Sequence, residues 1–153
     1  MIGVNITIDA NLLKAIGPQS EPVKDAKFRN FQHAAASIRK NARSSIKSAP
    51  PETRTRARRR RGQIVARARS GASRPGTPPY TRRGALRRAI LWDVNEQSAI
   101  IGPRQTVVGL SAAAHEFGET YKGTDYPERP FMQPALEQAL PRFADSWAGS
   151  IGE

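Results

Sequence analysis

Residues 129–136 read Arg-Pro-Phe-Met-Gln-Pro-Ala-Leu, and this stretch decides how the C-terminal part of the chain folds. Pro130 and Pro134 restrict the backbone on both sides of Phe131, so the chain there is stiff before any packing forms. Phe131 and Met132 are large apolar side chains, which are usually buried. They fill either the chain's own core, just before a helix, or an apolar pocket on a partner, and both alternatives stay open.

A C-terminal helix is predicted to begin near Pro134, because proline suits the first helical turn, where its missing N–H is not needed. The apolar stripe of this helix consists of Leu136, Leu140, Phe143, Trp147 and Ile151. Pro141 falls inside the stripe and is expected to bend the helix or to split it in two.

Residues 21–48 predict a second, longer amphipathic helix. Its apolar residues recur at spacings of three and four and therefore share one face; they are Phe28, Phe31, Ala35, Ile38 and Ala42. Pro50-Pro51 prevents the helix from continuing. The expected core combines both helices with a sheet, and its members are Leu136, Leu140, Phe143, Trp147, Phe28, Phe31, Ile38, Ile90 and Trp92.

A β-hairpin is predicted in the second half of the chain. Residues 86–94 and 98–102 are the two strands, and Asn95-Glu96-Gln97 is the turn between them. Ile90, Trp92 and Val94 alternate with other residues and so lie on one face of the first strand. The hairpin is the centre of the expected sheet.

Other segments extend this sheet. Val4, Ile6 and Ile8 alternate with polar residues and predict a short N-terminal strand. Residues 107–117 supply a third strand of a meander, or a strand followed by a helical turn, and residues 118–128 are expected to form a polar loop. The sequence thus predicts an α+β fold: an antiparallel β-meander packed by the two helices, in one domain spanning residues 1–153.

The net charge is +12, and the positive charge is concentrated in one segment. Residues 54–88 hold 13 of the 25 lysines and arginines and no acidic residue, which leaves 12 basic against 13 acidic residues elsewhere. Glycine, serine and proline are frequent after the first arginines, so residues 52–80 predict a long, extended basic arm or loop. Such an arm contacts a nucleic-acid backbone or an acidic protein surface, or is simply solvated.

No catalytic, metal-binding or cofactor-binding motif is recognisable in the chain, and we expect a protein that is not an enzyme. His115-Glu116-Phe117-Gly118-Glu119 imitates the start of a zinc-peptidase motif, but Glu119 stands where the second histidine ligand belongs. The chain contains no cysteine, and no phosphate-binding glycine loop is present. Neither a membrane-spanning apolar run nor an export signal is found, so synthesis in the cytoplasm is expected.

Four motifs occur in an order that resembles the tail-completion and head–tail joining (neck) proteins of long-tailed bacteriophages. Residues 76–90, Gly-Thr-Pro-Pro-Tyr-Thr-Arg-Arg-Gly-Ala-Leu-Arg-Arg-Ala-Ile, are similar to the proline stretch and first meander strand of that family. Residues 99–103 resemble the returning strand. His115-Glu116-Phe117-Gly118 and the Arg-Pro-Phe-Met-x-Pro-Ala-Leu run resemble the two closing motifs.

This resemblance implies a structural virion protein of a tailed phage or prophage that forms an oligomeric ring at the head–tail junction. The implied partners are further copies of itself, neighbouring neck, connector or tail-tube proteins, and packaged DNA, without a membrane or a small-molecule substrate. The implied subunit interface consists of Arg129, Pro130, Phe131, Met132 and Phe117. The concentration of positive charge, rather than the resemblance, predicts the contacts to DNA or to a partner, which are Arg54, Arg56, Arg58, Arg59, Arg60, Arg61, Arg67 and Arg69.

Another function fits the arginines alone. A small protein that binds nucleic acid without sequence preference would use the arm in the same way, through phosphate contacts that release counterions. The two hypotheses differ in what they expect of the free chain: the first expects rings, and the second expects tight, strongly salt-dependent binding of DNA.

Overall fold

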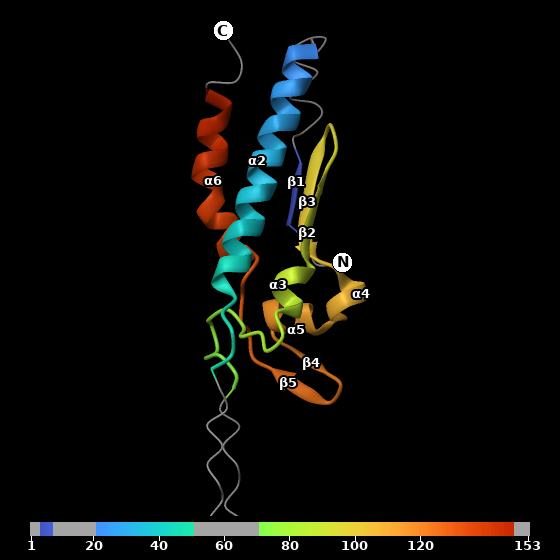
Figure 1. Ribbon diagram of the computed structural model, residues 1–153, viewed down its shortest axis with the longest axis vertical. Helices are drawn as coiled ribbons and strands as arrows, with labels where there is room; N and C mark the ends of the chain where they lie inside the picture. The colour runs from blue at the N-terminus through green and yellow to red at the C-terminus, as the bar shows by residue number, and fades with distance from the viewer. Residues whose placement is uncertain (1–3, 8–20, 51–70, 149–153) are drawn as a thin grey trace, which may run out of the picture.

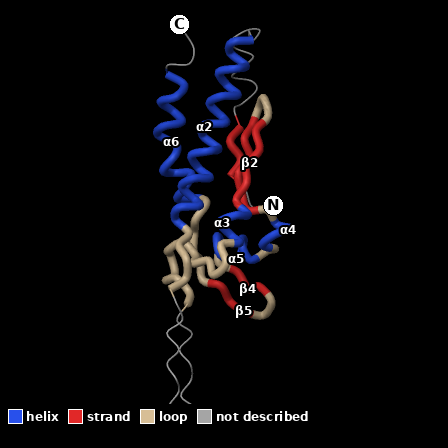
Figure 2. Tube along the Cα trace, in the orientation of Figure 1, coloured by secondary structure: helices blue, strands red, loops and turns tan. Residues whose placement is uncertain are grey.

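One long helix, α2 (Glu21–Ser45), lies between a β-sheet and the C-terminal helix α6 (Gln133–Ala148) (Figure 1). The computed structural model describes residues 4–7, 21–50 and 71–148. Figure 2 shows the two long helices side by side, with the sheet on the other side of α2. The architecture is therefore α+β, as the sequence predicts.

Helix α2 presents an alanine-rich apolar face. Phe31, Ala35, Ile38 and Ala42 on this face are fully buried, as their helical spacing predicts. At its end, the hydroxyls of Ser44 and Ser45 donate hydrogen bonds to backbone carbonyls of the preceding turn. Serine side chains thus satisfy carbonyls of the last helical turn. The helix ends three residues earlier than the predicted range of 21–48.

In the part of the chain that the structure describes, the sheet has three antiparallel strands in the order β1-β3-β2. These strands are β1 (Val4–Thr7), β2 (Ile90–Val94) and β3 (Ser98–Pro103). Strand β3 is central, because Ile101 pairs with Val4 on one side and with Trp92 on the other. The third strand is thus N-terminal, and the prediction that residues 107–117 supply it is wrong.

Residues 107–117 are helical instead. Most of them belong to α4 (Gln105–Val108) and α5 (Ser111–Phe117), which are separated by Leu110 and by Gly109, whose φ is positive. Ala112, Ala113 and Ala114 favour the helix, and Ala112 and Ala114 are buried. A further short helix, α3 (Ala85–Ala89), occupies the start of the predicted first hairpin strand, which therefore begins only at Ile90.

The predicted polar loop at 118–128 is a second hairpin. Its strands are β4 (Glu119–Tyr121) and β5 (Thr124–Tyr126), joined by Lys122 and Gly123. Both turn residues have positive φ, which a tight two-residue hairpin turn requires. Glycine adopts this conformation without steric cost, whereas lysine is an uncommon residue there, and for that reason the turn is hard to recognise in the sequence.

The core extends from the sheet through α2 to α6. Between the two long helices, the ring of Phe31 lies 6.2 Å from that of Phe143 and 6.4 Å from that of Trp147. Pro141 lies inside α6 without splitting it, so the apolar stripe continues past the proline to Trp147.

Of the nine expected core residues, three are buried, four are half-buried and two are exposed. Phe28 is 38% exposed and Leu140 is 46% exposed, so their assignment to the core of the described chain is wrong. Each lies at the margin of its helix's apolar stripe, where helical spacing alone does not tell a packed position from an outer one. Phe131 and Met132 belong to the core cluster itself, in agreement with the first of their two alternatives.

The two ends of the predicted arm are held together. Ser48 and Thr81 form a β-bridge, and Pro50 and Gly71 line the same cavity of about 260 Å³. Residues 71–80, which the prediction included in the arm, are packed against the body: Ser73 and Pro79 are buried. The remainder of the predicted arm, with Arg54, Arg56, Arg58, Arg59, Arg60, Arg61, Arg67 and Arg69, lies outside the described residues.

Phe131→Ala should lower the free energy of unfolding by about 3–5 kcal/mol, because it leaves a cavity in the core. Phe117→Ala removes the same atoms from a side chain that is 61% exposed, and should cost less than about 1 kcal/mol. Urea denaturation of the two variants under dilute conditions measures both values. Equal losses would contradict the assignment of Phe131 to the core.

Candidate functional site

The side chain of Glu116 caps the N-terminus of α6. This carboxylate is buried and accepts backbone N–H groups of Phe131 and Met132 at Oε2, at 2.9 and 3.1 Å, and of Gln133 at Oε1, at 3.0 Å. The first N–H groups of a helix lack partners within it and carry partial positive charge, so a carboxylate suits them. Glu116 thereby joins α5 to the start of α6.

Arg129 ties three distant segments together at the same place. Its buried guanidinium donates from Nε to the carbonyl of Ser73 at 3.0 Å, and its backbone N–H donates to the carbonyl of His115 at 2.6 Å. We call the group formed by Ser73, His115, Glu116, Arg129 and Phe131 the capping junction. It brings two of the motifs, far apart in sequence, into direct contact.

Gly118 allows the chain to turn tightly beside the capping junction. Its φ is +68°, and a Cβ built on it would lie 3.1 Å from the backbone nitrogen of Glu128. Any other residue would meet both the conformational cost and this contact. The His-Glu-Phe-Gly motif is thus explained by packing: its carboxylate caps a helix, and its glycine permits the turn.

His115 is half-buried in the capping junction. Its ring meets that of Tyr126 edge to face at a centroid distance of 5.1 Å, and its Nδ1 has no hydrogen-bond partner among the described residues. Burial, and secondarily the positive charge of Arg129, lowers the pKa of His115 below its usual value of 6.5. The imidazole is therefore neutral at neutral pH.

In the capping junction the side chains of Glu116 and Arg129 are bonded to backbone atoms, whereas Ser73 Oγ and His115 Nδ1 have no hydrogen-bond partner among the described residues. The oxygens of Glu116 are occupied by three backbone donors. Within the described ranges, no group of three or more histidine, cysteine, aspartate or glutamate side chains is placed to hold a metal ion.

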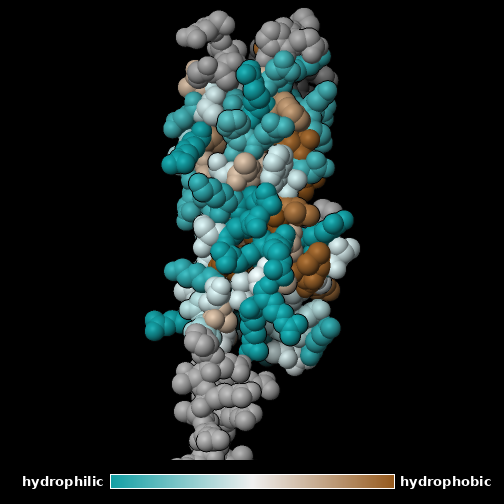
Figure 3. All heavy atoms as spheres, in the orientation of Figure 1, coloured by the Kyte–Doolittle hydropathy of each residue, from teal (hydrophilic) through white to brown (hydrophobic). Residues whose placement is uncertain are grey.

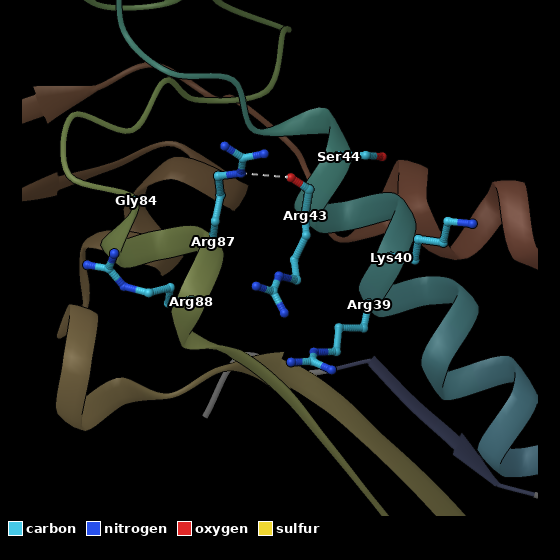
Figure 4. Close-up of a pocket in the computed structure, with 7 residues that line it drawn as sticks. All are labelled: Arg39, Lys40, Arg43, Ser44, Gly84, Arg87 and Arg88. Carbon is cyan, nitrogen blue, oxygen red and sulfur yellow. Dashed lines mark hydrogen bonds between the residues drawn. The ribbon is translucent and has the colours of Figure 1, made fainter.

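A positively charged groove lies between α2 and α3. Its volume is about 560 Å³, and we call it the cationic groove; it is lined by Arg39, Lys40, Arg43, Ser44, Gly84, Arg87 and Arg88. Figure 4 shows Arg39, Arg43 and Arg87 in the space between the two helices, with Lys40 and Arg88 on its outer sides. No aspartate or glutamate of the described chain is among the lining residues.

A second surface feature is apolar. Val107 and Leu110 are each 54% exposed and Phe117 is 61% exposed, all on or next to α4 and α5. Leu91 and Ile100 are exposed on the sheet. We call these five residues the apolar surface, and Figure 3 shows apolar atoms along the side formed by the sheet and α4.

The predicted interface residues differ in how exposed they are. Phe131, Met132 and Arg129 are buried within this chain, so their side chains are not available to a partner in this conformation. Pro130 is half-buried, and only Phe117 is well exposed. The predicted arginine contacts from 54 to 69 lie outside the described residues.

Two features cannot be found from sequence patterns. The carboxylate of Glu116 bonds to residues that lie 15 to 17 positions further along the chain, and no regular sequence spacing predicts such a bond. The cationic groove combines two halves that are at least 40 positions apart, although Arg39 and Arg43 share a helix face and Arg87 and Arg88 are adjacent.

Glu116→Ala should lower the free energy of unfolding by about 2–4 kcal/mol, because it leaves three N–H groups at the start of α6 without their charged acceptor. Glu116→Gln, which keeps one acceptor oxygen, should fall between Ala and the wild type. Glu119→Ala removes an exposed carboxylate nearby and serves as the control. If all three variants were equally stable, the cap would have no energetic role.

The stability of the protein should fall as the pH drops below about 6.5. The unfolded chain binds a proton at His115 near the usual pKa of 6.5, whereas the folded chain resists it until a lower pH. Between these values the unfolded state holds more protons, so acid favours unfolding, and the contribution is fully present above the unfolded pKa.

Melting temperatures between pH 7.5 and 5.5 measure this dependence. His115→Gln should flatten the dependence, and His33→Gln, the same substitution at an exposed position, serves as the control for loss of a histidine. The same slope in His115→Gln and in the wild type would count against the effect.

Comparison with known proteins gives no information on the function. No protein-family model, no curated protein and no solved structure matches the chain. Within residues 4–7, 21–50 and 71–148, none of the helices combines the length and the apolar composition needed to cross a bilayer.

Proposed function

We propose that this chain is a structural virion protein of a tailed phage or prophage and forms an oligomeric ring at the head–tail junction. The first support is the resemblance of four ordered motifs to tail-completion and neck proteins. In this proposal the chain is made in the cytoplasm of the bacterial host and resides in the neck or tail of the particle.

The capping junction supports a structural role for these motifs. In an enzyme, motif residues commonly present free polar groups to a substrate. Here Glu116 and Arg129 direct theirs to backbone atoms of the same chain. The motifs therefore fix the direction of α6 and the position of the turn before it, which suits a subunit that must be rigid.

The apolar surface is the observation that carries the proposal. Val107, Leu110 and Phe117 are more than half exposed on adjacent short helices, although burial of such side chains is worth about 1.5–3 kcal/mol each. Exposed apolar groups of this kind are typical of contacts between proteins. We assign them to a second copy of the chain, which would cover them in a closed ring.

A ring also requires a second, different surface on each subunit. Strand β2 is an edge strand of the described sheet, so part of its backbone is available for pairing or covering by a neighbour. The arginines from Arg54 to Arg69 would provide a further joint, to packaged DNA or to neighbouring neck, connector or tail-tube proteins. The described residues on either side of these arginines, Pro50 and Gly71, line the same cavity.

The test is the mass of the purified protein in solution. Light scattering and sedimentation should give several times the 16.8 kDa of one chain, and electron microscopy should show rings. The double variant Leu110→Ser, Phe117→Ser should shift the mass toward that of one chain without lowering the melting temperature of the monomer.

Leu140→Ser is the matched control, because Leu140 is also an exposed leucine but lies on α6. It should assemble like the wild type. A wild-type protein that remains at 16.8 kDa up to high concentration would contradict the ring. Equal effects of the control and the double variant would contradict the assignment of the apolar surface.

A further inference from the structure

We infer that the cationic groove between α2 and α3 binds the phosphate backbone of double-stranded DNA. The inference concerns residues of the folded body and does not depend on the arginines from 54 to 69. It also does not require the ring, because it follows from the charge and geometry of one chain.

The charge of the groove identifies the class of ligand. Five of its seven lining residues are lysine or arginine, and none of the others is acidic. Like charges gathered in one hollow repel one another, and an anion with several charges relieves this repulsion. Arginine in particular offers a planar fork that matches two phosphate oxygens.

The structure also orients part of the groove in advance. Arg39 donates from Nε to the carbonyl of Ile90 at 3.1 Å, and Arg87 donates from Nε to the carbonyl of Arg43 at 3.2 Å (Figure 4). Both bonds use Nε, which leaves the terminal nitrogens of the two guanidinium groups to face a ligand. A phosphate would thus meet side chains that have already lost part of their freedom.

These two bonds give Arg39 and Arg87 a role in holding the fold together. They give no such role to the other three cations of the groove. Lys40 and Arg88 are exposed on the outer sides of the groove, and the side chain of Arg43 lies between the helices. A solvent-exposed face of α2 would by itself account for Lys40 and Arg43. It would not explain why α3 places Arg87 and Arg88 at the same groove.

The residue types that line the cationic groove favour duplex DNA over a single strand. Single strands are held largely by aromatic side chains that stack on the bases. None of the residues that line the cationic groove is aromatic. A duplex needs only contacts to phosphates, which follow one another along each strand at about 3.4 Å of helix axis. Two groups of cations on separate helices suit such a row.

The experiment measures binding of a fluorescently labelled 30-base-pair duplex of mixed sequence to the full chain by anisotropy, over a range of salt concentrations. The groove variant carries Lys40→Gln, Arg43→Gln and Arg88→Gln, which preserve the side-chain bonds of Arg39 and Arg87. The control variant removes the same charge at exposed positions elsewhere, through Arg29→Gln, Lys122→Asn and Arg142→Gln. Asparagine is chosen at Lys122 because it tolerates the positive φ there.

The wild type should bind with a steep dependence of affinity on salt. In the groove variant the slope of log K against log salt should become shallower by about 0.9 for each of the three phosphates that the protein no longer neutralises. The control variant should keep nearly the wild-type slope. The same comparison is made in chains in which Arg58 to Arg61 are replaced by serine, and the groove effect should persist there.

Three results would overturn the inference. Equal losses in the groove and control variants would show that only net charge matters. Disappearance of the groove effect in the chains with serine at 58–61 would assign binding to those arginines. Groove-dependent binding of poly-glutamate, with duplex binding unchanged, would assign the groove to an acidic protein partner. Circular dichroism and light scattering of each variant separate these results from loss of folding or of self-association.

Discussion

The bond between the Glu116 carboxylate and the start of α6 is the constraint on which the rest of the described structure depends. A buried carboxylate is costly to desolvate unless it is well bonded, and three backbone N–H groups with the helix dipole behind them offset that cost. This bond fixes where α6 begins. It therefore places Phe131 in the core and aligns Phe143 and Trp147 with Phe31.

The bonds of the capping junction bear on function, because they engage the polar groups of Glu116 and Arg129 within the chain. Arg129, which the resemblance assigns to a subunit interface, is occupied by the carbonyls of Ser73 and Pro127 within the same chain. In the two proposals, the apolar surface and the cationic groove recognise partners, in addition to the edge of β2 and the arginines from 54 to 69. The apolar surface suits a protein neighbour and the cationic groove a polyanion, and both roles remain proposals that rest on exposure and charge.

The elements that the sequence predicts well are those with a long periodic pattern. The two long helices and the pair β2 and β3 were predictable, because their apolar positions repeat many times or alternate around a clear turn. Helices α3, α4 and α5 are too short for such a pattern, and the hairpin turn at Lys122-Gly123 has an unusual residue at positive φ. The role of Glu116 was not predictable, since its partners come from another element and bond through their backbone.

The charge pattern shows most clearly why position in sequence is not position in space. By sequence, residues 54–88 are basic and the remainder is almost neutral. In the fold, Arg87 and Arg88 from the basic segment lie beside Arg39, Lys40 and Arg43 from the remainder, and the five form one groove. A count along the chain assigns the attraction for anions to an extended arm alone. In the fold, the proposed site joins two packed helices, and bonds to backbone carbonyls hold Arg39 and Arg87 in place there. Guanidinium groups held in this way suit a regularly spaced row of phosphates better than a diffuse counterion cloud.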